Sequence, residues 1–270
     1  MANANDKSML AKFFENTSPK EHPNFWAKCW EEKVTPWDRG GPSIALYDLL
    51  NENPDGVIPL PSESSPKRAL VPGCGKGHDV LLLSSLGYDV YGLDVTTQAI
   101  DAARENAEKA LAGGLYKTEG GGRRGAVSWI CQDFYAEKWD DVPRTFDLIF
   151  DYTFFCAMPP SVRPAWATKI KSLLAPGGRL ICLEFPSEKK SSEPGPPWAS
   201  PPAEYIGYLS NPGTKPPTDE HGGVIAGQTE SAAPNGIKRL VHIKPKRTHA
   251  GGTKDGRVQD YISVWVHANE

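Results

Sequence analysis

The stretch RALVPGCGKGHD, residues 68–79, decides the fold. Its first five residues form a short apolar run, which predicts a buried strand. Glycines at positions 73, 75 and 77 then predict a tight turn, because a residue without a Cβ permits backbone conformations and close approaches that other residues do not. A helix is expected over 76–86, ended by Gly87.

The same alternation continues on both sides of this stretch. Apolar runs predict strands over 88–93, 126–131, 146–150 and 179–185, and helical patterns fill 96–111 and 160–174. Alternating strands and helices of this length predict a doubly wound, mostly parallel α/β sheet. After residue 236 two strands, 237–243 and 261–267, follow without a helix, so we expect an antiparallel pair at the sheet edge. Helices over 9–16, 22–33 and 43–50 are expected to cap the sheet.

This pattern predicts one domain over residues 1–270. Within it we expect a helical cap at 1–52, a nucleotide-binding core at 67–186 and closing strands at 237–267. Residues 211–236 contain four prolines and five glycines with little periodic apolar content, and they are expected to form a flexible loop. We expect the protein to be a monomer.

Composition excludes several classes of protein. With 30 Lys and Arg against 33 Asp and Glu, the net charge of −3 argues against a nucleic-acid partner. No apolar run approaches the ~20 residues that cross a bilayer, and the first residues lack the plan of a signal peptide, so a cytoplasmic protein is expected. Five cysteines without a CxxC pair disfavour disulfides and a zinc knuckle, and no cluster has metal-ligand spacing.

Three ligands compete for the glycine-rich turn. A P-loop requires a Gly-Lys-Ser/Thr that Lys76 does not provide, and a dinucleotide site requires G-x-G-x-x-G. Gly73, Gly75 and Gly77 form the tighter G-x-G-x-G, which suits a nucleoside without a pyrophosphate, such as S-adenosylmethionine. A tight turn that binds nothing remains the simpler alternative.

Acidic residues follow the next two predicted strands. Asp94 stands where a carboxylate binds ribose hydroxyls in nucleotide-binding sheets, although it also suits the cap of the following helix. Asp133 and Phe134 end the third strand, where they would offer a carboxylate and an aromatic face to adenine; a turn aspartate is the alternative. Together the strand ends provide contacts for methionine, ribose and adenine in that order.

Three of the eight tryptophans lie close together in the sequence. Trp26 and Trp30 are four residues apart and share a helix face, and Trp37 follows the turn at Thr35-Pro36. Aromatic faces attract a sulfonium cation, which cannot donate hydrogen bonds, by about 0.5–2 kcal/mol each. The alternative is simple packing of the N-terminal helices on the sheet.

These segments resemble the thiopurine methyltransferase family of class I S-adenosylmethionine-dependent methyltransferases, and within it the plant and fungal thiol and halide (thiocyanate) methyltransferase branch. The similarity covers roughly residues 20–205. The matching segments are Trp26-x3-Trp30-x6-Trp37, Leu70–Asp79, Gly92–Asp94, Asp133-Phe134, Phe146–Ala157, Arg163–Trp166 and Gly195–Trp198. Trp198 stands where the branch has a tyrosine, and the tail after residue 210 is longer than the branch leads us to expect.

The resemblance implies a Rossmann-like, seven-stranded, mostly parallel sheet with one antiparallel strand. It implies that S-adenosylmethionine binds without a metal and leaves as S-adenosylhomocysteine. The implied cofactor contacts are Trp26, Trp30, Trp37, Gly73, Asp94, Asp133, Phe134 and Tyr152, to which the turn itself adds Gly75. Trp198 would lie on the substrate side.

The end of the fourth strand, FDYTFFC at 150–156, indicates the acceptor. It lacks the paired prolines found in methyltransferases that act on amino groups of bases. Phe154 and Phe155 offer instead an apolar, polarisable pocket for a soft nucleophile. A thiol of pKa near 8.5, or an anion such as hydrosulfide, thiocyanate or a halide, needs little help from a base. No residue is therefore required as a general base; Tyr152 is expected to orient the nucleophile or contact the cofactor, and Cys156 to be a packed thiol.

The sequence thus predicts a thiol S-methyltransferase with a small-molecule thiol or anion as its substrate. Three alternatives remain open at this point. One is an O- or N-methyltransferase of a small natural product, and another is a methyltransferase-like protein that binds S-adenosylmethionine without turnover. The third, a nicotinamide-dependent oxidoreductase, is disfavoured by the early third glycine.

Overall fold

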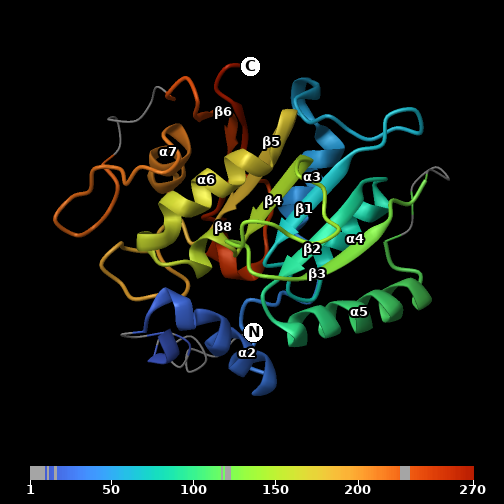
Figure 1. Cartoon of the computed structure of the whole chain (residues 1–270), viewed down its shortest axis with the longest axis horizontal. Coiled ribbons are helices and arrows are strands. Elements are labelled where there is room, and N and C mark those ends of the chain that lie inside the picture. Colours follow the sequence, from blue (N-terminus) through green and yellow to red (C-terminus); the bar gives the residue numbers. More distant parts are fainter. Residues whose placement is uncertain (1–9, 11, 15–16, 117, 119–122, 226–231) are drawn as a thin grey trace.

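A computed structural model describes residues 10, 12–14, 17–116, 118, 123–225 and 232–270. A seven-stranded sheet forms the centre of the fold (Figure 1). Its strand order is β3-β2-β1-β4-β5-β9-β6, and β9 alone runs in the direction opposite to the other strands of the sheet. The strands are β1 (Arg68–Pro72), β2 (Asp89–Asp94), β3 (Val127–Cys131), β4 (Phe146–Tyr152), β5 (Leu174–Glu184), β6 (Ile237–Ile243) and β9 (Tyr261–His267). The predicted sheet with one antiparallel strand is confirmed.

The sheet reverses its winding between β1 and β4. From β1 the chain continues outward to β2 and β3, and it then returns to place β4 on the other side of β1. Ligands of doubly wound sheets bind at the carboxyl ends of the strands beside such a reversal. The topology therefore locates a ligand site at the turn that begins with Gly73.

Helices cover both faces of the sheet. One face packs against α3 (Ile44–Glu52) and α4 (His78–Ser85), and α5 (Thr97–Ala112) lies beside α4. The other face packs against α6 (Arg163–Leu173) and α7 (Pro202–Ser210), which Figure 1 shows together beside β5. The sequence prediction missed α7, which begins with a proline at its first turn, where the absent N–H costs nothing.

The N-terminal helix α2 (His22–Glu31) lies across the carboxyl ends of the strands, next to α5 (Figure 1). Gln98 at the start of α5 donates a 2.9 Å hydrogen bond to Glu31 at the end of α2. Of the predicted helix over 9–16, the described residues 10 and 12–14 are helical, and the others lie outside the described part of the chain. Residues Leu10 and Phe14 pack with Cys29 of α2 in a small apolar cluster.

The predicted 211–236 loop is only partly described, because residues 226–231 lie outside the described ranges. Its first half packs against the domain. Val224 is buried, and its N–H donates a 3.3 Å hydrogen bond to Glu204 of α7. Glu204 in turn forms a buried ion pair with Arg163 of α6, with a separation of 2.8 Å.

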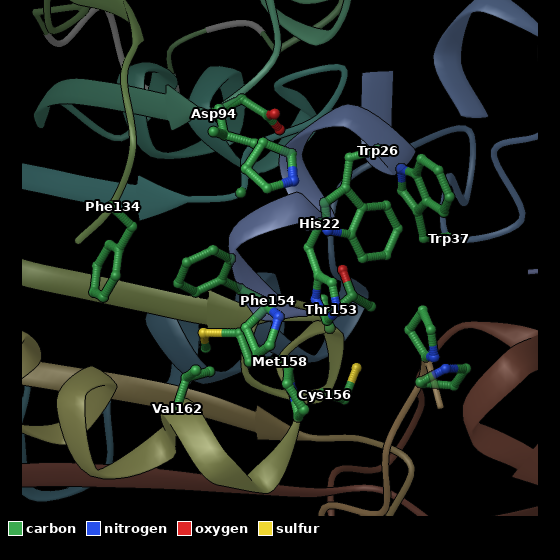
Figure 2. A pocket seen from close by; sticks show the side chains of 18 of the residues that line it. His22, Trp26, Trp37, Asp94, Phe134, Thr153, Phe154, Cys156, Met158 and Val162 are labelled. Carbon is green, nitrogen blue, oxygen red and sulfur yellow. The ribbon is translucent and has the colours of Figure 1, made fainter. Parts of the chain in front are cut away.

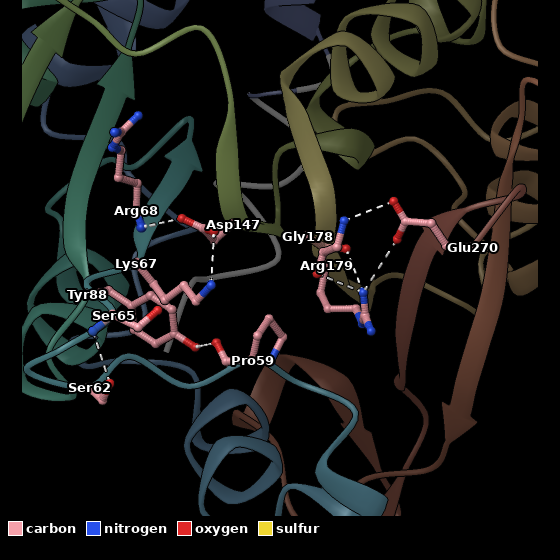
Figure 3. A network of polar contacts seen from close by, with 11 residues as sticks. Pro59, Ser62, Ser65, Lys67, Arg68, Tyr88, Asp147, Gly178, Arg179 and Glu270 are labelled. Atoms are coloured by element: carbon pink, nitrogen blue, oxygen red, sulfur yellow. Dashed lines mark hydrogen bonds and ion pairs between the residues drawn. The ribbon is translucent and has the colours of Figure 1, made fainter.

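A polar network ties together the opposite end of the sheet (Figure 3). The Asp147 carboxylate accepts a 2.8 Å hydrogen bond from the backbone N–H of Arg68 and lies 3.5 Å from the Lys67 ammonium. The Tyr88 hydroxyl donates to the carbonyl of Pro59 at 3.0 Å. The Asp147 contacts join β1 and β4 at their amino ends, and the Tyr88 contact ties the start of β2 to the loop before β1. The carboxyl ends remain available for a ligand.

Candidate active site

A cavity of about 370 Å³ lies at the carboxyl ends of the strands, beneath α2 (Figure 2). The glycine turn and the ends of β2 and β3 line one part of it, and residues around the end of β4 line the other. Among the residues that line it are His22, Trp26, Trp30, Trp37, Arg39, Gly73, Asp94, Asp133, Phe134, Thr153, Phe154, Cys156, Met158, Phe185, Pro196 and Pro197. Most of the predicted site residues are therefore brought together.

The glycine-rich turn requires its glycines. Gly73, Gly75 and Gly77 have φ values of +60°, +51° and +70°, a left-handed conformation that strains other residues. A Cβ on Gly73 would lie 2.5 Å from the ring of Phe154, so Gly73 also lets this ring approach the floor of the cavity. Gly75 does not line the cavity but lies beneath the indoles of Trp30 and Trp37.

Asp94 connects the second strand to the glycine turn. Its Oδ2 accepts the Gly75 N–H at 3.2 Å, and its Oδ1 accepts from the N–H and hydroxyl of Thr96, both at 3.2 Å. Burial raises the pKa of Asp94, and these donors oppose the rise. Thr96, rather than Asp94, caps α5 through the Ala99 N–H. Oδ1 thus carries two donors and Oδ2 one, so acceptor capacity remains on Oδ2.

The end of β3 provides the next pair of side chains. Asp133 lines the cavity, and its carboxylate accepts the Tyr135 N–H at 2.9 Å, as a turn aspartate does. Phe134 is buried and meets Phe154 edge to face, with ring centres 5.0 Å apart. Figure 2 shows these two rings side by side at the end of the cavity away from Trp37.

The three tryptophans form one wall of the cavity. The rings of Trp26 and Trp30 each meet Trp37 edge to face, with centre distances of 5.2 and 5.8 Å. The residue after Trp37 fixes this wall, because Asp38 binds the Lys76 ammonium at 2.6 Å and the His78 imidazole at 3.3 Å. These bonds hold the pKa of the Asp38 carboxyl well below its usual range.

Two predicted residues at the end of β4 point away from the cavity. The Tyr152 side chain shares the face of Leu148 and Phe150, because residues two apart on a strand face the same way, and it does not line the cavity. Phe155 is fully buried between Trp166 and Tyr205, with ring centres 4.6 and 4.3 Å away. Phe154 does line the cavity.

Trp198 also lies outside the lining, while the preceding Pro196 and Pro197 contribute to it. The Trp198 indole stacks on the imidazole of His22, with ring centres 5.9 Å apart and planes inclined by 10°. Trp198 thereby supports His22, which lines the cavity (Figure 2). Burial lowers the pKa of His22, so this imidazole is neutral at pH 7.

The structure agrees with the interpretation of Cys156 as a packed thiol. This side chain lines the cavity but is 3% exposed, and burial raises its pKa to about 12. It therefore remains protonated at neutral pH and contributes polarisable apolar surface.

Among the cavity residues that the sequence did not predict are His22, Arg39, Thr153 and Met158. His22 precedes the tryptophans on α2, and Arg39 follows them, so their position in the chain was a signal for both. Thr153 has a φ of +59°, which no sequence pattern indicated. Within the described ranges, no group of three or more His, Cys, Asp or Glu side chains is arranged to hold a metal ion.

The fold and the site together define a class I methyltransferase domain. Solved structures similar in fold include an N1-methyltransferase of 1,6-didemethyltoxoflavin from Burkholderia thailandensis with bound S-adenosylhomocysteine, at a TM-score of 0.53 and 15% identity. That alignment covers 92% of this chain and 90% of the other. Magnesium protoporphyrin IX methyltransferase of Synechocystis, also with bound S-adenosylhomocysteine, matches at a TM-score of 0.50 and 13% identity over 97% of this chain and 99% of the other.

The family is evident from the sequence comparisons. Residues 21–225 match the model of the thiopurine S-methyltransferase family, and the chain belongs to this family. It is 39% identical to a probable thiol methyltransferase of Arabidopsis thaliana over 67% of this chain and 69% of that protein. It is 40% identical to thiocyanate methyltransferase 1 of the same plant, over 60% of this chain and 61% of that protein. The resemblance drawn from the motifs is therefore confirmed.

None of the helices in the described part of the chain is long and apolar enough to cross a membrane.

Proposed function

We propose that this protein transfers the methyl group of S-adenosylmethionine to a small thiol or a soft anion. The observation that carries this proposal is the order of groups around one cavity. The glycine turn, Asp94 and Asp133 follow one another along its strand-end side, and an aromatic and sulfur-rich pocket lies beyond Phe154. The relatives named as thiol, thiocyanate and thiopurine methyltransferases support the same acceptor class.

The residues present fit the nucleoside. Gly73 presents backbone without a Cβ at the floor of the cavity, and Oδ2 of Asp94 has unused acceptor capacity for a ribose hydroxyl. Asp133 and Phe134 offer a carboxylate and an apolar ring to adenine. When bound, S-adenosylmethionine supplies an activated methyl group on a sulfonium. The role of this chain is to bind and orient the nucleoside and to exclude water from the acceptor.

The wall of Trp26, Trp30 and Trp37 is assigned to the sulfonium. Aromatic faces stabilise a cation that cannot donate hydrogen bonds, by about 0.5–2 kcal/mol each. The ion pair between Asp38 and Lys76 holds this wall against the glycine turn. The attraction weakens when the sulfur becomes neutral, which favours release of S-adenosylhomocysteine.

The acceptor pocket is apolar and polarisable. Phe154, Cys156, Met158 and Phe185 line it, so it suits sulfur better than a strongly hydrated oxygen nucleophile. A thiol with a pKa near 8.5 is ionised to a few per cent at pH 7, and thiocyanate carries its charge at any ordinary pH. Alignment and exclusion of water are then sufficient for the reaction, and this proposal assigns no general base.

An acceptor panel tests the proposal. The purified full-length chain is given S-adenosylmethionine with thiocyanate, hydrosulfide, a small organic thiol, a phenol or an aliphatic amine, and kcat/KM is measured from S-adenosylhomocysteine release. We expect a sulfur acceptor to exceed the phenol and the amine by at least tenfold. Preference for the phenol or amine would contradict the proposed acceptor class, and no turnover with any acceptor would contradict the activity.

A further inference from the structure

We propose that the acceptor end of the cavity is a binding site for a soft monovalent anion, centred on the guanidinium of Arg39. The inference rests on the proposed methyl transfer and makes it more specific: the acceptor is recognised by its negative charge. Arg39 lines the cavity, and its guanidinium lies over the ring of Phe185, which lines the acceptor pocket. Thiocyanate and hydrosulfide are therefore preferred over neutral thiols.

At least one N–H donor of Arg39 is unused, and the others make few close hydrogen bonds. Its Nη1 donates one long hydrogen bond, 3.3 Å, to the carbonyl of Pro36, and its Nε is buried without a partner in the described structure. The adjacent carboxylate, Asp38, is bound to Lys76 and His78 instead. A guanidinium has five N–H donors, and a cation withdrawn from water without a partner is costly. An anion in the cavity would accept hydrogen bonds from the free donors and would also balance the charge of the guanidinium.

The walls around Arg39 hold it in place. Its guanidinium carbon lies 5.3 Å from the ring centre of Phe185. On another side the backbone of Gly251 is so close that an added Cβ would lie 2.9 Å from the guanidinium. Gly251 belongs to the short 3-10 helix Ala250–Gly252, beyond residue 225, where the family match ends. The C-terminal tail of this particular chain thus packs against the cation.

The Tyr152 hydroxyl interacts with the Arg39 guanidinium without a well-formed hydrogen bond, and two further buried polar atoms near Arg39, Nε2 of His249 and Oδ1 of Asp260, have no hydrogen-bond partner in the described structure. The Tyr152 and His249 rings are stacked, with centres 6.2 Å apart and planes inclined by 9°. Native proteins leave few such atoms unpaired, and a bound ion or water is a common reason. Tyr152, which does not line the cavity itself, is thereby placed behind Arg39 as a positioning residue.

At pH 7 Arg39 faces a neutral imidazole, His249, and a mostly ionised carboxylate, Asp260, that forms no ion pair with it in the described structure. Burial lowers the pKa of His249, and the charge of Arg39 lowers it further, so His249 is neutral at pH 7. Asp260 faces Arg39 from the tail; burial raises its pKa to about 6, opposed by Thr248 and Arg39. Its other oxygen, Oδ2, accepts the Thr248 hydroxyl at 2.8 Å. No ion pair joins Asp260 to Arg39 in the described structure.

This arrangement suits the reaction. A lone pair on the thiocyanate sulfur forms the new bond to the methyl carbon, and the electron pair of the broken carbon–sulfur bond stays on the cofactor sulfur. No proton and no oxidant are needed. Before transfer the anion lies between two cations, the sulfonium and Arg39. Afterwards both products are neutral at sulfur, so both attractions that hold the acceptor are lost.

Anion binding without turnover tests the proposal. The full-length protein is saturated with S-adenosylhomocysteine, and binding of radiolabelled thiocyanate is measured by equilibrium dialysis at constant ionic strength. Arg39→Met is compared with wild type and with Arg104→Met. The control removes the same charge from an exposed position on α5, where Arg104 pairs with Asp101. We expect Arg39→Met to weaken thiocyanate binding at least tenfold, and Arg104→Met to change it less than twofold.

Equal thiocyanate affinity in wild type and Arg39→Met would overturn the proposal and indicate that water bridges the unpaired atoms. If Arg39→Met does not bind S-adenosylhomocysteine, Arg39→Lys replaces it and must weaken thiocyanate at least threefold, because an ammonium cannot reproduce the planar donor set. The dialysis measurement of thiocyanate binding involves no methyl transfer, and it is compared with the turnover of the same proteins. Failure of the proposed function would appear as thiocyanate binding without methylated product, whereas failure of the Arg39 site would appear as turnover that Arg39→Met leaves unchanged.

Discussion

The Lys76 ammonium and the Asp38 carboxylate are 2.6 Å apart, and this ion pair joins the glycine turn to the tryptophan wall. His78 binds the same carboxylate from the start of α4. Two segments that are 35 or more residues apart in the sequence are thereby fixed on opposite sides of one cavity. The position of the tryptophans thus depends on a polar contact as well as on apolar packing.

Replacing Asp38 with Asn should lower the free energy of unfolding by about 1–3 kcal/mol at pH 7, because the Lys76 ammonium loses its charged acceptor and His78 loses its partner. Affinity for S-adenosylhomocysteine should fall as well. Asp101→Asn, at an exposed position on α5, should change the unfolding free energy by less than about 0.5 kcal/mol. Denaturant unfolding checks both values, and equal stability of the two variants would contradict the role of Asp38.

The same contact predicts a pH dependence. Because the pKa of Asp38 is lower in the folded protein than its ordinary value near 3.9, the ionised carboxylate favours folding. This contribution is fully present above about pH 5 and is lost as the pH falls through and below the ordinary value. The stability difference between wild type and Asp38→Asn, measured by denaturant unfolding from pH 7 to pH 3, should shrink toward the acid end. A difference that grows with acidity would contradict the assignment.

Asp94→Ala should weaken S-adenosylhomocysteine binding by about 10–100-fold, equivalent to about 1.4–2.8 kcal/mol. The change removes the acceptor assigned to the ribose and also the bond from Gly75, which is 3.2 Å long. Asp94→Asn keeps one acceptor oxygen and should fall between wild type and Asp94→Ala. Calorimetric titration measures all three proteins, and unchanged affinity of Asp94→Ala would refute the ribose assignment.

Trp30→Ala should reduce affinity for S-adenosylmethionine more than affinity for S-adenosylhomocysteine, because the indole attracts the sulfonium and not the neutral sulfide. One aromatic contact of about 0.5–2 kcal/mol corresponds to a preference of roughly 2–30-fold. The ratio of the two dissociation constants within one variant serves as its own control against general damage to the site. Equal losses for both ligands would identify Trp30 as a packing residue.

Much of this architecture was predictable from the sequence because its signals are local. The glycines of the turn need positive φ values, and the strands between Arg68 and Glu184 are short apolar runs between helices. The last two strands were predicted with the residue ranges observed. The prediction missed α7, whose two initial prolines resemble a loop in the sequence although the first turn of a helix accepts proline.

The site was predicted less completely, because the direction of a side chain depends on tertiary packing. Tyr152 and Phe155 lie within the same motif as Phe154, yet only Phe154 lines the cavity. Phe155 is directed inward by the packing of α6 and α7, which the motif does not reveal. The position of Arg39 after the tryptophans suggests the cavity, but its surroundings depend on Gly251, which lies more than 200 residues later in the chain.

Thiol labelling should distinguish the cysteines. Cys131 is exposed at the end of β3, whereas Cys156 is buried and its pKa is raised to about 12. Iodoacetamide at pH 8 should therefore modify Cys131 well before Cys156 in the folded protein, because only the thiolate reacts. Peptide mass spectrometry after timed quenching gives both rates. Rapid modification of Cys156 would show a reactive thiol in the cavity and would contradict its assignment as packing.

The most direct test of methyl transfer to a soft sulfur nucleophile uses S-adenosylmethionine with a deuterated methyl group. The purified protein is incubated with this cofactor and thiocyanate or hydrosulfide, and the headspace and solution are analysed by mass spectrometry. The account predicts a volatile product that carries the intact deuterated methyl group on sulfur, formed in equal amount to S-adenosylhomocysteine. No labelled product from either acceptor, in a preparation that binds S-adenosylhomocysteine, would contradict it.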